Sequence, residues 1–478
     1  MSTSRQVAKN VIWRYFEMFF TMCIQMLCTF IMARFLSPSD YGILGIVLVF
    51  SAFADVFIYS GFGQALIREK TVTRVDYSTI LYFNIAVSLV LYALLFFSSE
   101  LIADFYEQPI LNDICKVAYL ILPIHALSLV QMTKLQKEIK FKKNFFISFI
   151  SSLVSALIAI YIAYLYRSVW ALVLQVMMTS AIRCVLLWAT SDFIPVLRFS
   201  KESFNKYFKF SKNLLLSGFI GTLFNNILSL IIGKAYSTAE LGFYSQANKI
   251  STIGSQTTTQ VIQSVTYPVL SRLDNEDHDI KGGYKKTISI SLIVVGFLMS
   301  MLISCAKDFF ELCMGSVVWR TAGTYMMLLG IDSILYPLQA INQNILLVKG
   351  KSNTILHLEV FRRSLMLTII LIAINFNITV FVFSTSIYAL TQLIPNLYYC
   401  GKPIDYTVTE QLKDTMPIFT RLIIMVLLGY FSAYMLSSLH IIARITLSCT
   451  VCMTSGLLLF WKQQNFRELL KLVKSMIK

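Results

Sequence analysis

The sequence predicts an all-α membrane protein with about fourteen transmembrane helices. Of its 478 residues, 56% are hydrophobic and only 14% are charged, whereas soluble domains carry roughly a quarter charged residues. Long apolar stretches alternate with short polar ones along the whole chain. Lys and Arg are concentrated in every second polar stretch, which is the bias that fixes the orientation of membrane helices. These three features predict a chain that crosses a bilayer many times.

The predicted membrane spans follow from the length of the apolar stretches, since a helix needs about 20 mostly apolar residues to cross the hydrocarbon core. The first span is kept as a real helix because Arg14 and Glu17 interrupt it and no small-residue cleavage site follows. The eighth is rich in Ser, Thr and Gln, which suits a wet cavity or a helix interface better than lipid. The eleventh begins with charged residues. The fourteen spans are 11–33, 41–64, 79–98, 114–132, 145–165, 169–189, 213–233, 244–268, 287–305, 321–347, 355–375, 378–397, 417–437 and 440–461.

The distribution of positive charge predicts that both termini are cytoplasmic. With the N-terminus inside, the inside segments hold 28 Lys and Arg, the outside segments hold six, and seven lie within or at the ends of spans. Short cytoplasmic loops keep Lys and Arg because translocating them is unfavourable. The formal net charge of +16 is therefore explained by a surface that faces anionic lipid headgroups. No soluble basic domain is present that would bind nucleic acid.

A repeat divides the chain into two similar halves. The segment from Arg34 to Gly42, R-F-L-S-P-S-D-Y-G, returns as K-A-Y-S-T-A-E-L-G from Lys234 to Gly242, with base, Ser, acid and Gly in register at an offset of 200 residues. Parallel repeats of this kind are a transporter architecture, with the substrate path at the interface of the halves. We expect two pseudo-symmetric six-helix lobes and two extra C-terminal helices. The predicted parts are an N-terminal lobe 1–197, a cytoplasmic linker 198–212, a C-terminal lobe 213–397, a helix pair 415–461 and a basic tail 462–478.

The linker between the lobes alternates aromatic and basic residues. Its Phe and Lys pattern fits a short amphipathic helix at the cytoplasmic interface. A solvated linker fits it equally well.

Charged residues inside spans are the first candidates for a binding site, because such residues are costly in lipid and usually face a cavity or a partner. Arg14 and Glu17 are three residues apart and share one helix face. One reading is a local ion pair that serves helix packing. The other is a positively charged cavity wall that binds an anionic ligand, with a carboxylate that returns the wall to its starting state. Amide side chains on the middle spans suit sugar hydroxyls. The cavity candidates are Arg14, Glu17, Asp55, Arg183, Asn225, Asn226, Lys249, Gln256, Gln260 and Asp332.

The two repeated segments supply candidates for an outer gate. Arg34 with Asp40, and Lys234 with Glu240, recur at the outer end of each half. They are either gate contacts or loop-stabilising ion pairs, which contribute roughly 0–1 kcal/mol each when exposed.

The first repeated segment, followed by G-F-G-Q-A-L-I-R from Gly61 to Arg68, resembles the N-terminal half of bacterial polysaccharide (Wzx-type) flippases of the MATE-like exporter superfamily. The resemblance implies a V-shaped pair of lobes that works by alternating access. The substrate class that it implies is oligosaccharide on undecaprenyl pyrophosphate, as an O-antigen, capsule or exopolysaccharide unit. The cellular location that it implies is the bacterial inner membrane, where the substrate moves from the cytoplasmic to the periplasmic leaflet. Its partners would be this lipid-linked oligosaccharide, membrane lipids and, as candidates, a glycan polymerase and chain-length proteins.

The family resemblance favours spans 1, 2, 7 and 8 as cavity walls. Arg14, Asp55 and Lys249 are therefore the preferred cavity candidates. Two other readings stay open. A cation-coupled multidrug exporter of the same superfamily would need an acidic chamber, whereas the chamber predicted for this chain is mostly basic. A membrane polysaccharide polymerase or ligase would need larger outside loops or a carboxylate cluster.

No catalytic residue, metal site or cofactor is expected. The four histidines, His125, His278, His357 and His440, are scattered along the chain and predict neither a metal site nor a triad. No nucleotide-binding motif is complete. Coupling to a proton or sodium gradient through Glu17, Asp55 or Asp332 is a hypothesis that rests on their membrane placement.

Overall fold

The computed structural model describes residues 2–59, 61–275, 279–435 and 438–468 as helices joined by short turns, and no β-strand occurs in this part of the chain. Contacts between Cα atoms divide the protein into two compact units, Met1–Gly242 and Phe243–Lys478. Each unit is described by itself below.

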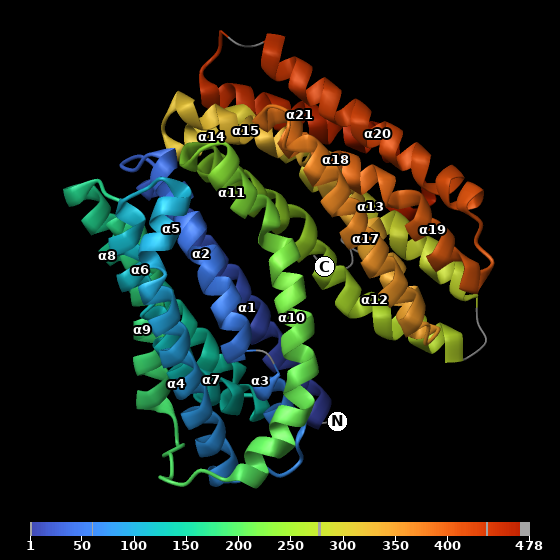
Figure 1. Ribbon diagram of the computed structural model, residues 1–478. Helices are drawn as coiled ribbons and strands as arrows, with labels where there is room; N and C mark the ends of the chain where they lie inside the picture. Colours follow the sequence, from blue (N-terminus) through green and yellow to red (C-terminus); the bar gives the residue numbers. More distant parts are fainter. Residues whose placement is uncertain (1, 60, 276–278, 436–437, 469–478) are drawn as a thin grey trace. The chain divides into compact units, whose positions relative to one another are not determined.

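Unit 1 contains ten helices and the beginning of an eleventh (Figure 1). Short helices at the outer turn, α5 and α6, join two long ones. The helices are α1 (Ser2–Met32), α2 (Pro38–Tyr59), α3 (Phe62–Arg68), α4 (Arg74–Phe97), α5 (Ser99–Tyr106), α6 (Ile110–Ala118), α7 (Ile121–Lys137), α8 (Phe141–Tyr166), α9 (Trp170–Thr190), α10 (Lys201–Ala235) and the first turn of α11 (Thr238–Thr252).

Unit 2 contains the rest of α11 and the remaining helices. A π-helical turn, Ile253–Thr257, separates α11 from α12, and 3₁₀ turns at Val317–Trp319 and Lys402–Ile404 connect other elements. The helices are α12 (Thr258–Asn275), α13 (Ile280–Ser304), α14 (Ala306–Met314), α15 (Arg320–Leu328), α16 (Gly330–Val348), α17 (Ser352–Ala373), α18 (Ile378–Thr391), α19 (Leu393–Gly401), α20 (Val408–Met435) and α21 (Ile441–Phe460).

Eleven helical segments among the described residues are long and apolar enough to cross a membrane. The protein is therefore a multi-pass membrane protein, and eleven of the fourteen predicted spans coincide with these segments. The three others, 244–268, 321–347 and 355–375, are helical as well, but they are more polar or interrupted. The full count of fourteen stays a prediction.

Small side chains let the helices of unit 1 pack closely. Helix α8 lies between α1 and α9, and its buried face carries Ser148, Ser151, Ser155 and Ala159. Membrane helices pack through such small residues because the hydrophobic effect contributes little to helix association in lipid, and close van der Waals contact takes its place. Helix α7 packs against α2, α4 and α9, and α10 lies along α2.

The predicted linker 198–212 differs from both expectations. From Lys201 onward it is the beginning of α10, which continues without a break to Ala235. The Tyr207 ring is buried with Phe62, Tyr77 and Phe193 in an apolar cluster of unit 1. Of the phenylalanines that suggested an interfacial helix, Phe204 and Phe210 pack against this cluster, whereas Phe199 and Phe208 are exposed.

Unit 2 is built around α13, which packs against α16, α20 and α21. The buried core combines Leu292, Ile341 and Leu422 with a polar pair in the interior. The buried amide of Asn342 accepts a hydrogen bond from the Tyr284 hydroxyl and donates one to Asn396 Oδ1 at 3.0 Å. The last two helices, predicted as an addition, are thus an integral part of the core of unit 2.

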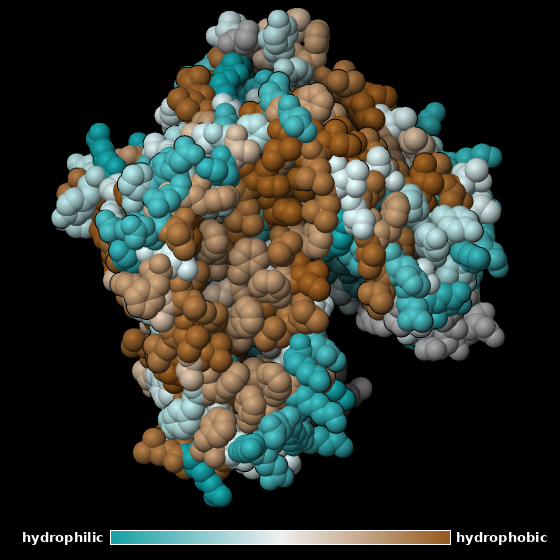
Figure 2. Space-filling view, in the orientation of Figure 1, coloured by the Kyte–Doolittle hydropathy of each residue, from teal (hydrophilic) through white to brown (hydrophobic). Residues whose placement is uncertain are grey.

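The surface has the pattern expected of helices that cross a bilayer. On the face of unit 1 seen in Figure 2, hydrophobic residues cover the middle and hydrophilic residues gather toward the ends. Large apolar side chains such as Leu157 and Tyr161 on α8 are exposed. This exposure is unfavourable in water and favourable in hydrocarbon.

Candidate functional site

A buried carboxylate on α1 is surrounded by polar groups from two other helices. Glu17 is 5% exposed, and its Oε2 receives a hydrogen bond from Arg14 Nη1 at 2.8 Å. Its Oε1 accepts hydrogen bonds from Asn144 Nδ2 at 2.7 Å and Ser148 Oγ at 2.9 Å, both on α8. Arg183 Nη2, from α9, lies 4.0 Å from the same oxygen. Local spacing pairs Arg14 with Glu17, and tertiary packing adds the other three groups.

The two arginines of this cluster are placed differently. The Arg14 side chain is 43% exposed, whereas that of Glu17 is only 7% exposed. One edge of the Arg14 guanidinium is held by the carboxylate, and its remaining N–H groups form a planar fork suited to phosphate oxygens. Arg183 contacts Met132 Sδ at 3.6 Å, and its Nε has no hydrogen-bond partner among the described residues. Glu17 therefore holds the guanidinium of Arg14, whose side chain stays partly exposed.

A second polar cluster joins α2, α7 and α9. Asp55 Oδ1 lies 2.7 Å from His125 Nδ1, and His125 Nε2 lies 3.1 Å from Ser180 Oγ. The Asp55 and His125 side chains are 26% and 18% exposed. The Tyr59 ring, one turn after Asp55 on α2, lies 5.5 Å from the imidazole. The sequence predicted neither a metal site nor a triad among the histidines, and it did not predict this hydrogen-bonded contact of His125 with Asp55 and Ser180.

The same order of Asp, His and Ser occurs in serine hydrolases, where an oxyanion hole must accompany it. Ser180 lies in the middle of the continuous helix α9, where backbone N–H groups are already bonded within the helix. The local geometry therefore supports a line of hydrogen bonds rather than acyl transfer.

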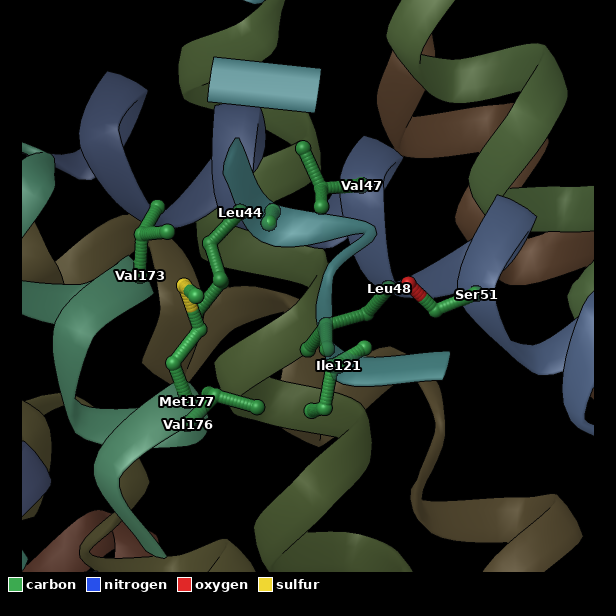
Figure 3. A pocket seen from close by; sticks show the side chains of 9 residues that line it. Leu44, Val47, Leu48, Ser51, Ile121, Val173, Val176 and Met177 are labelled. Carbon is green, nitrogen blue, oxygen red and sulfur yellow. The ribbon is translucent and has the colours of Figure 1, made fainter. Parts of the chain in front are cut away.

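A small apolar pocket adjoins the second cluster (Figure 3). It is lined from α2, α7 and α9 by Ser51, Ile121 and Met177 together with leucine and valine side chains. Each of these three residues precedes a member of the cluster by three or four positions on its own helix. The pocket thus lies one helical turn from the cluster, on the side of the N-termini of these helices.

Ser37 and Asp40 cap a helix in the first repeated segment, and Ser237 does so in the second. The Ser37 backbone N–H donates to Asp40 Oδ2 at 2.8 Å, and the Asp40 N–H donates to Ser37 Oγ at 3.3 Å. This reciprocal pair is a capping box at the N-terminus of α2. In the second repeat the Glu240 N–H donates to Ser237 Oγ at 3.1 Å. The S-x-x-D/E spacing was the signal for this role.

The basic gate candidates follow a different pattern from the predicted pairs. Within the described chain no ion pair joins Arg34 to Asp40. Lys234 Nζ lies 2.8 Å from Glu107 Oε1. The hydrogen bond from Lys234 lowers the pKa of this exposed carboxyl. Gating by these residues stays a prediction.

Two glycines bring the repeated segments into direct contact inside unit 1. A Cβ placed on Gly42 would lie 1.7 Å from the Thr238 carbonyl oxygen, and one placed on Gly242 would lie 1.9 Å from that of Pro38. The contact is reciprocal, since Thr238 occupies in the second repeat the position of Pro38 in the first. The Ser39 and Thr238 hydroxyls are 2.6 Å apart at the same place. The glycines are therefore required by a close crossing of backbones.

The remaining candidates are distributed over α10 and unit 2. Asn225 is exposed, and Asn226 Nδ2 donates to the Thr222 carbonyl at 2.8 Å. In unit 2, Lys249 on α11 and Gln256 in the π-helical turn are half-buried, while Gln260 is exposed. Asp332 on α16 is half-buried. Electrostatic contacts link it to the tyrosines Tyr244, Tyr336 and Tyr388.

The π-helical turn changes which face of the segment its amide side chains share. An extra residue per turn shifts the register between Gln256 and Gln260.

No group of three His, Cys, Asp or Glu side chains among the described residues could hold a metal ion.

The helices define a multi-pass membrane protein with the fold of known transporters. The structure matches "Lipid II flippase MurJ, inward closed conformation" with a TM-score of 0.72, over 94% of this chain and 99% of that chain, at 13% identity. It also matches an inward-facing multidrug resistance MATE family transporter of the MOP superfamily, with a TM-score of 0.63 over 82% of this chain and 98% of that chain, at 13% identity. At these identities the likeness establishes the fold alone.

The chain belongs to the polysaccharide biosynthesis protein family, whose model matches residues 31–323. Teichuronic acid biosynthesis protein TuaB of Bacillus subtilis (strain 168) is 24% identical over 74% of this chain and 73% of its own length. Succinoglycan biosynthesis transport protein ExoT of Rhizobium meliloti (strain 1021) is 22% identical over 70% and 68%. Lipopolysaccharide biosynthesis protein WzxC of Escherichia coli (strain K12) is 21% identical over 72% and 70%. The resemblance to polysaccharide exporters of the MATE-like superfamily is confirmed.

Proposed function

We propose that this protein is a flippase for oligosaccharide linked to undecaprenyl pyrophosphate. It moves an O-antigen, capsule or exopolysaccharide unit from the cytoplasmic to the periplasmic leaflet of the bacterial inner membrane by alternating access. The observation that carries the proposal is Arg14, a half-exposed arginine on a membrane helix, which is held in place by the buried carboxylate of Glu17. The printed names of the relatives, which concern polysaccharide biosynthesis and its transport, support the substrate class.

The physical problem for such a transporter is desolvation of the headgroup. The lipid tail can stay in hydrocarbon throughout, but each unpaired polar group costs several kcal/mol there. A pyrophosphate with several sugars would therefore cost tens of kcal/mol by summing such terms. Arg14 and Arg183 on unit 1 would match the pyrophosphate charge, and an amide such as Asn225 would bind sugar hydroxyls. Within unit 2, Lys249 and Gln260 are separate candidates for the same kinds of contact.

The charge bias of the loops supports an orientation with both termini cytoplasmic. A transport cycle without a nucleotide site needs another energy source, and we propose a proton or sodium gradient. The lipid-linked oligosaccharide and membrane lipids are the proposed partners, with a glycan polymerase and chain-length proteins as candidate associates. No catalytic step is proposed.

A cation-coupled multidrug exporter is the second candidate, because a MATE family transporter shares the fold. Cationic drugs would favour a chamber lined by unpaired carboxylates. In unit 1 the two intramembrane carboxylates, Glu17 and Asp55, are each bound to basic side chains. This pairing favours an anionic cargo. A polysaccharide polymerase or ligase is the remaining alternative, and it would make or break glycosidic bonds instead of moving its substrate.

Deletion of the gene tests the proposal directly. We expect finished lipid-linked oligosaccharide to accumulate in the cytoplasmic leaflet, measured by its resistance to a glycan-modifying enzyme added outside spheroplasts. Loss of a polymerase would instead leave single units exported. Normal surface polysaccharide in the deletion strain would reject the flippase assignment, and altered drug resistance alone would favour the exporter.

Replacing Arg14 with alanine is expected to lower glycan export roughly 10-fold to 100-fold, because hydrogen bonds to a charged partner contribute about 1.5–3 kcal/mol. Lys249→Ala should have a similar effect. Export is measured as surface polysaccharide in the deletion strain that carries each variant at equal membrane abundance. Lys142→Ala is the matched control, since Lys142 is an exposed cation whose Nζ lies 5.6 Å from the Trp13 ring centroid near the same helix. Equal loss in all three would indicate a general charge effect.

A further inference from the structure

We propose that Arg362 in unit 2 binds a carboxylate of the transported glycan, and hence that the cargo contains an acidic sugar. The inference rests on the proposed flippase function and specifies the class of its cargo. Arg362 lies on α17, in the predicted span that begins with charged residues, together with Glu359 and Arg363. Charged side chains within spans bind a partner or line the path of a polar ligand.

One edge of the Arg362 guanidinium is buried and unpaired. The side chain is 8% exposed, and its Nη1 donates to Glu359 Oε1 at 3.1 Å. Nε and Nη2 are buried and have no hydrogen-bond partner among the described residues. These two nitrogens belong to the planar fork that pairs with both oxygens of a carboxylate or a phosphate. Because a buried charged donor without an acceptor is costly, this edge is preorganised for an anionic ligand.

Glu359 does not pair with this edge, because other donors engage both of its oxygens. Oε1 accepts a second hydrogen bond, from Gln343 Nε2 on α16 at 3.2 Å, and Oε2 lies 3.5 Å from Arg363 Nε. Glu359 therefore fixes the orientation of Arg362. With two arginines and one glutamate, the cluster has a formal net charge of +1, which one carboxylate would neutralise.

The only other carboxylate on α16, α17 and α18 is Asp332. It precedes Gln343 on α16 by eleven residues, which is about 16 Å by helical rise. No ion pair joins Asp332 to Arg362 in the part of the chain that the structure describes. The positive charge of the cluster therefore lacks a counter-ion on these three helices.

Amide and hydroxyl groups from α16 and α18 lie beside the arginine. Gln339 is one turn from Gln343 on α16, and its buried Nε2 has no hydrogen-bond partner among the described residues. Gln392, at the C-terminal end of α18, donates to Gln339 Oε1 at 3.1 Å. Tyr388, one turn before Gln392, responds electrostatically to Arg362, and α18 packs against α17 (Figure 1) and α16. The carboxylate site thus adjoins groups that suit sugar hydroxyls.

The cluster is accessible at its edge. The Glu359 and Arg363 side chains are 37% and 30% exposed, and Gln343 and Tyr388 are half-buried. We expect a ligand to reach the buried fork by displacing such side chains, while the backbone stays in place. Arg362 itself remains held by Glu359.

The depth of Arg362 distinguishes the cargo from ordinary lipid as the source of the anion. Lys351, predicted to be cytoplasmic, precedes Arg362 by eleven residues, or about 16 Å of helix. That is roughly half of a hydrocarbon core of about 30 Å. Phospholipid headgroups stay at the interface, whereas a transported glycan passes the midplane. A pyrophosphate carries more than one negative charge, which exceeds the charge of the cluster. A carboxyl group on the glycan is therefore the ligand.

The first test measures binding without transport. Full-length protein in nanodiscs is mixed with glucuronate, and saturation transfer from protein to ligand is followed by NMR. We expect the methyl ester of glucuronate to bind at least about tenfold more weakly, because it loses a charge-assisted pair of hydrogen bonds. Equal binding of the ester, or displacement of glucuronate by a lower concentration of inorganic phosphate, overturns the carboxylate site. Glucuronate binding that is lost when anionic phospholipid is added to the nanodiscs overturns it in favour of a lipid headgroup.

Substitutions at Arg362 separate the fork from the charge. Arg362→Lys keeps the positive charge beside Glu359 but lacks the planar fork, so we expect it to fold and to bind glucuronate at least about tenfold more weakly. Arg362→Gln should lose binding altogether. Arg421→Gln is the matched control, because Arg421 on α20 of the same unit donates to Gln463 Oε1 at 3.0 Å instead. Wild-type affinity for glucuronate in Arg362→Lys overturns the proposal.

The composition of the glycan tests the same inference in the cell. Sugar analysis of the exported polysaccharide should show a uronic acid or another carboxylated sugar, and a glycan without carboxyl groups overturns the proposal. In the deletion strain we expect Arg362→Lys to export at least about tenfold less than wild type at equal membrane abundance. Arg421→Gln should export normally. Wild-type export by Arg362→Lys also overturns the proposal.

The failures of the two proposals are distinguishable. If deletion of the gene leaves export intact while glucuronate binding still depends on Arg362, the flippase function fails and the carboxylate site stands. If deletion traps lipid-linked oligosaccharide while wild type and Arg362→Lys bind glucuronate equally, the carboxylate site fails and the flippase stands.

Discussion

Replacing Gly42 with alanine is expected to destabilise the contact between the two repeated segments and to lower the thermal unfolding midpoint of the purified protein. The new Cβ would lie 1.7 Å from the Thr238 carbonyl oxygen, a backbone atom that cannot rotate away. The start of α11 would have to move away from α2, and overpacking of this kind costs typically about 1–3 kcal/mol. Gly242→Ala should have a comparable effect, since its Cβ would meet the Pro38 carbonyl at 1.9 Å.

The control for this prediction is Gly221→Ala on α10, where nothing lies within 4 Å of the added Cβ. That change should leave the midpoint equal or slightly higher, because alanine favours a helix interior over glycine by roughly 0.5–1 kcal/mol. Thermal unfolding in detergent, followed by the fluorescence of a thiol-reactive dye, compares the three variants. A midpoint for Gly42→Ala at or above that of Gly221→Ala would show that the close crossing does not contribute to stability.

The repeated contact also bears on the predicted gate. The charge bias predicts that both segments lie at outer turns, so we propose that the crossing, held by the glycines and by the Ser39–Thr238 hydroxyl pair, contributes to that gate. If the crossing opens during each cycle, Gly42→Ala should shift the population toward the open form as well as lower stability. An engineered disulfide between cysteines at positions 39 and 238 should then block export until it is reduced.

Replacing Glu17 with alanine is expected to cost about 3 kcal/mol of stability. The substitution leaves Arg14 and Arg183 without their shared counter-ion and deprives Asn144 Nδ2 and Ser148 Oγ of their acceptor. Removing one partner of a buried ion pair costs about 3–5 kcal/mol. The lower end applies here because the Arg14 side chain is 43% exposed and can turn to solvent.

Glu17→Gln separates charge from hydrogen bonding in this cluster, since the amide keeps an acceptor oxygen but not the negative charge. We expect an intermediate loss of stability and a loss of export that exceeds what stability alone explains. Glu138→Ala is the matched control, because Glu138 forms partly exposed ion pairs with Lys134 and Lys140, which contribute about 0–1 kcal/mol. Equal unfolding midpoints for Glu17→Ala and Glu138→Ala would mean that the buried cluster is not a structural anchor.

Part of the candidate site was predictable from local spacing. Arg14 and Glu17 are three residues apart, and a helix places such residues on one face. Asp55 was predictable as a candidate because a lone carboxylate in a span needs a partner. Its partner was not, since His125 lies 70 positions away and no periodic pattern connects α2 with α7. For the same reason Asn144 and Ser148 were missed, although their own spacing of four residues on α8 is helical.

The repeated segments show the same division at the level of the fold. The offset of 200 residues was visible in the sequence, and the S-x-x-D/E pattern carried the signal of a capping box. The sequence suggested ion pairs instead, because a base and an acid six residues apart look complementary when only charge is considered. The structure assigns Asp40 to the helix N-terminus, where its carboxylate satisfies a free backbone N–H.

By itself the sequence determined the class of the protein, the position of most membrane helices and the alternation of the loops. These properties depend on the transfer of short segments between water and lipid, and each segment contributes independently. The tertiary structure alone decided which polar groups meet, that the first turns of α10 pack as part of unit 1, and that two glycines hold a backbone crossing. Those properties depend on contacts between residues far apart in the chain, and their energies exist only once the helices are packed.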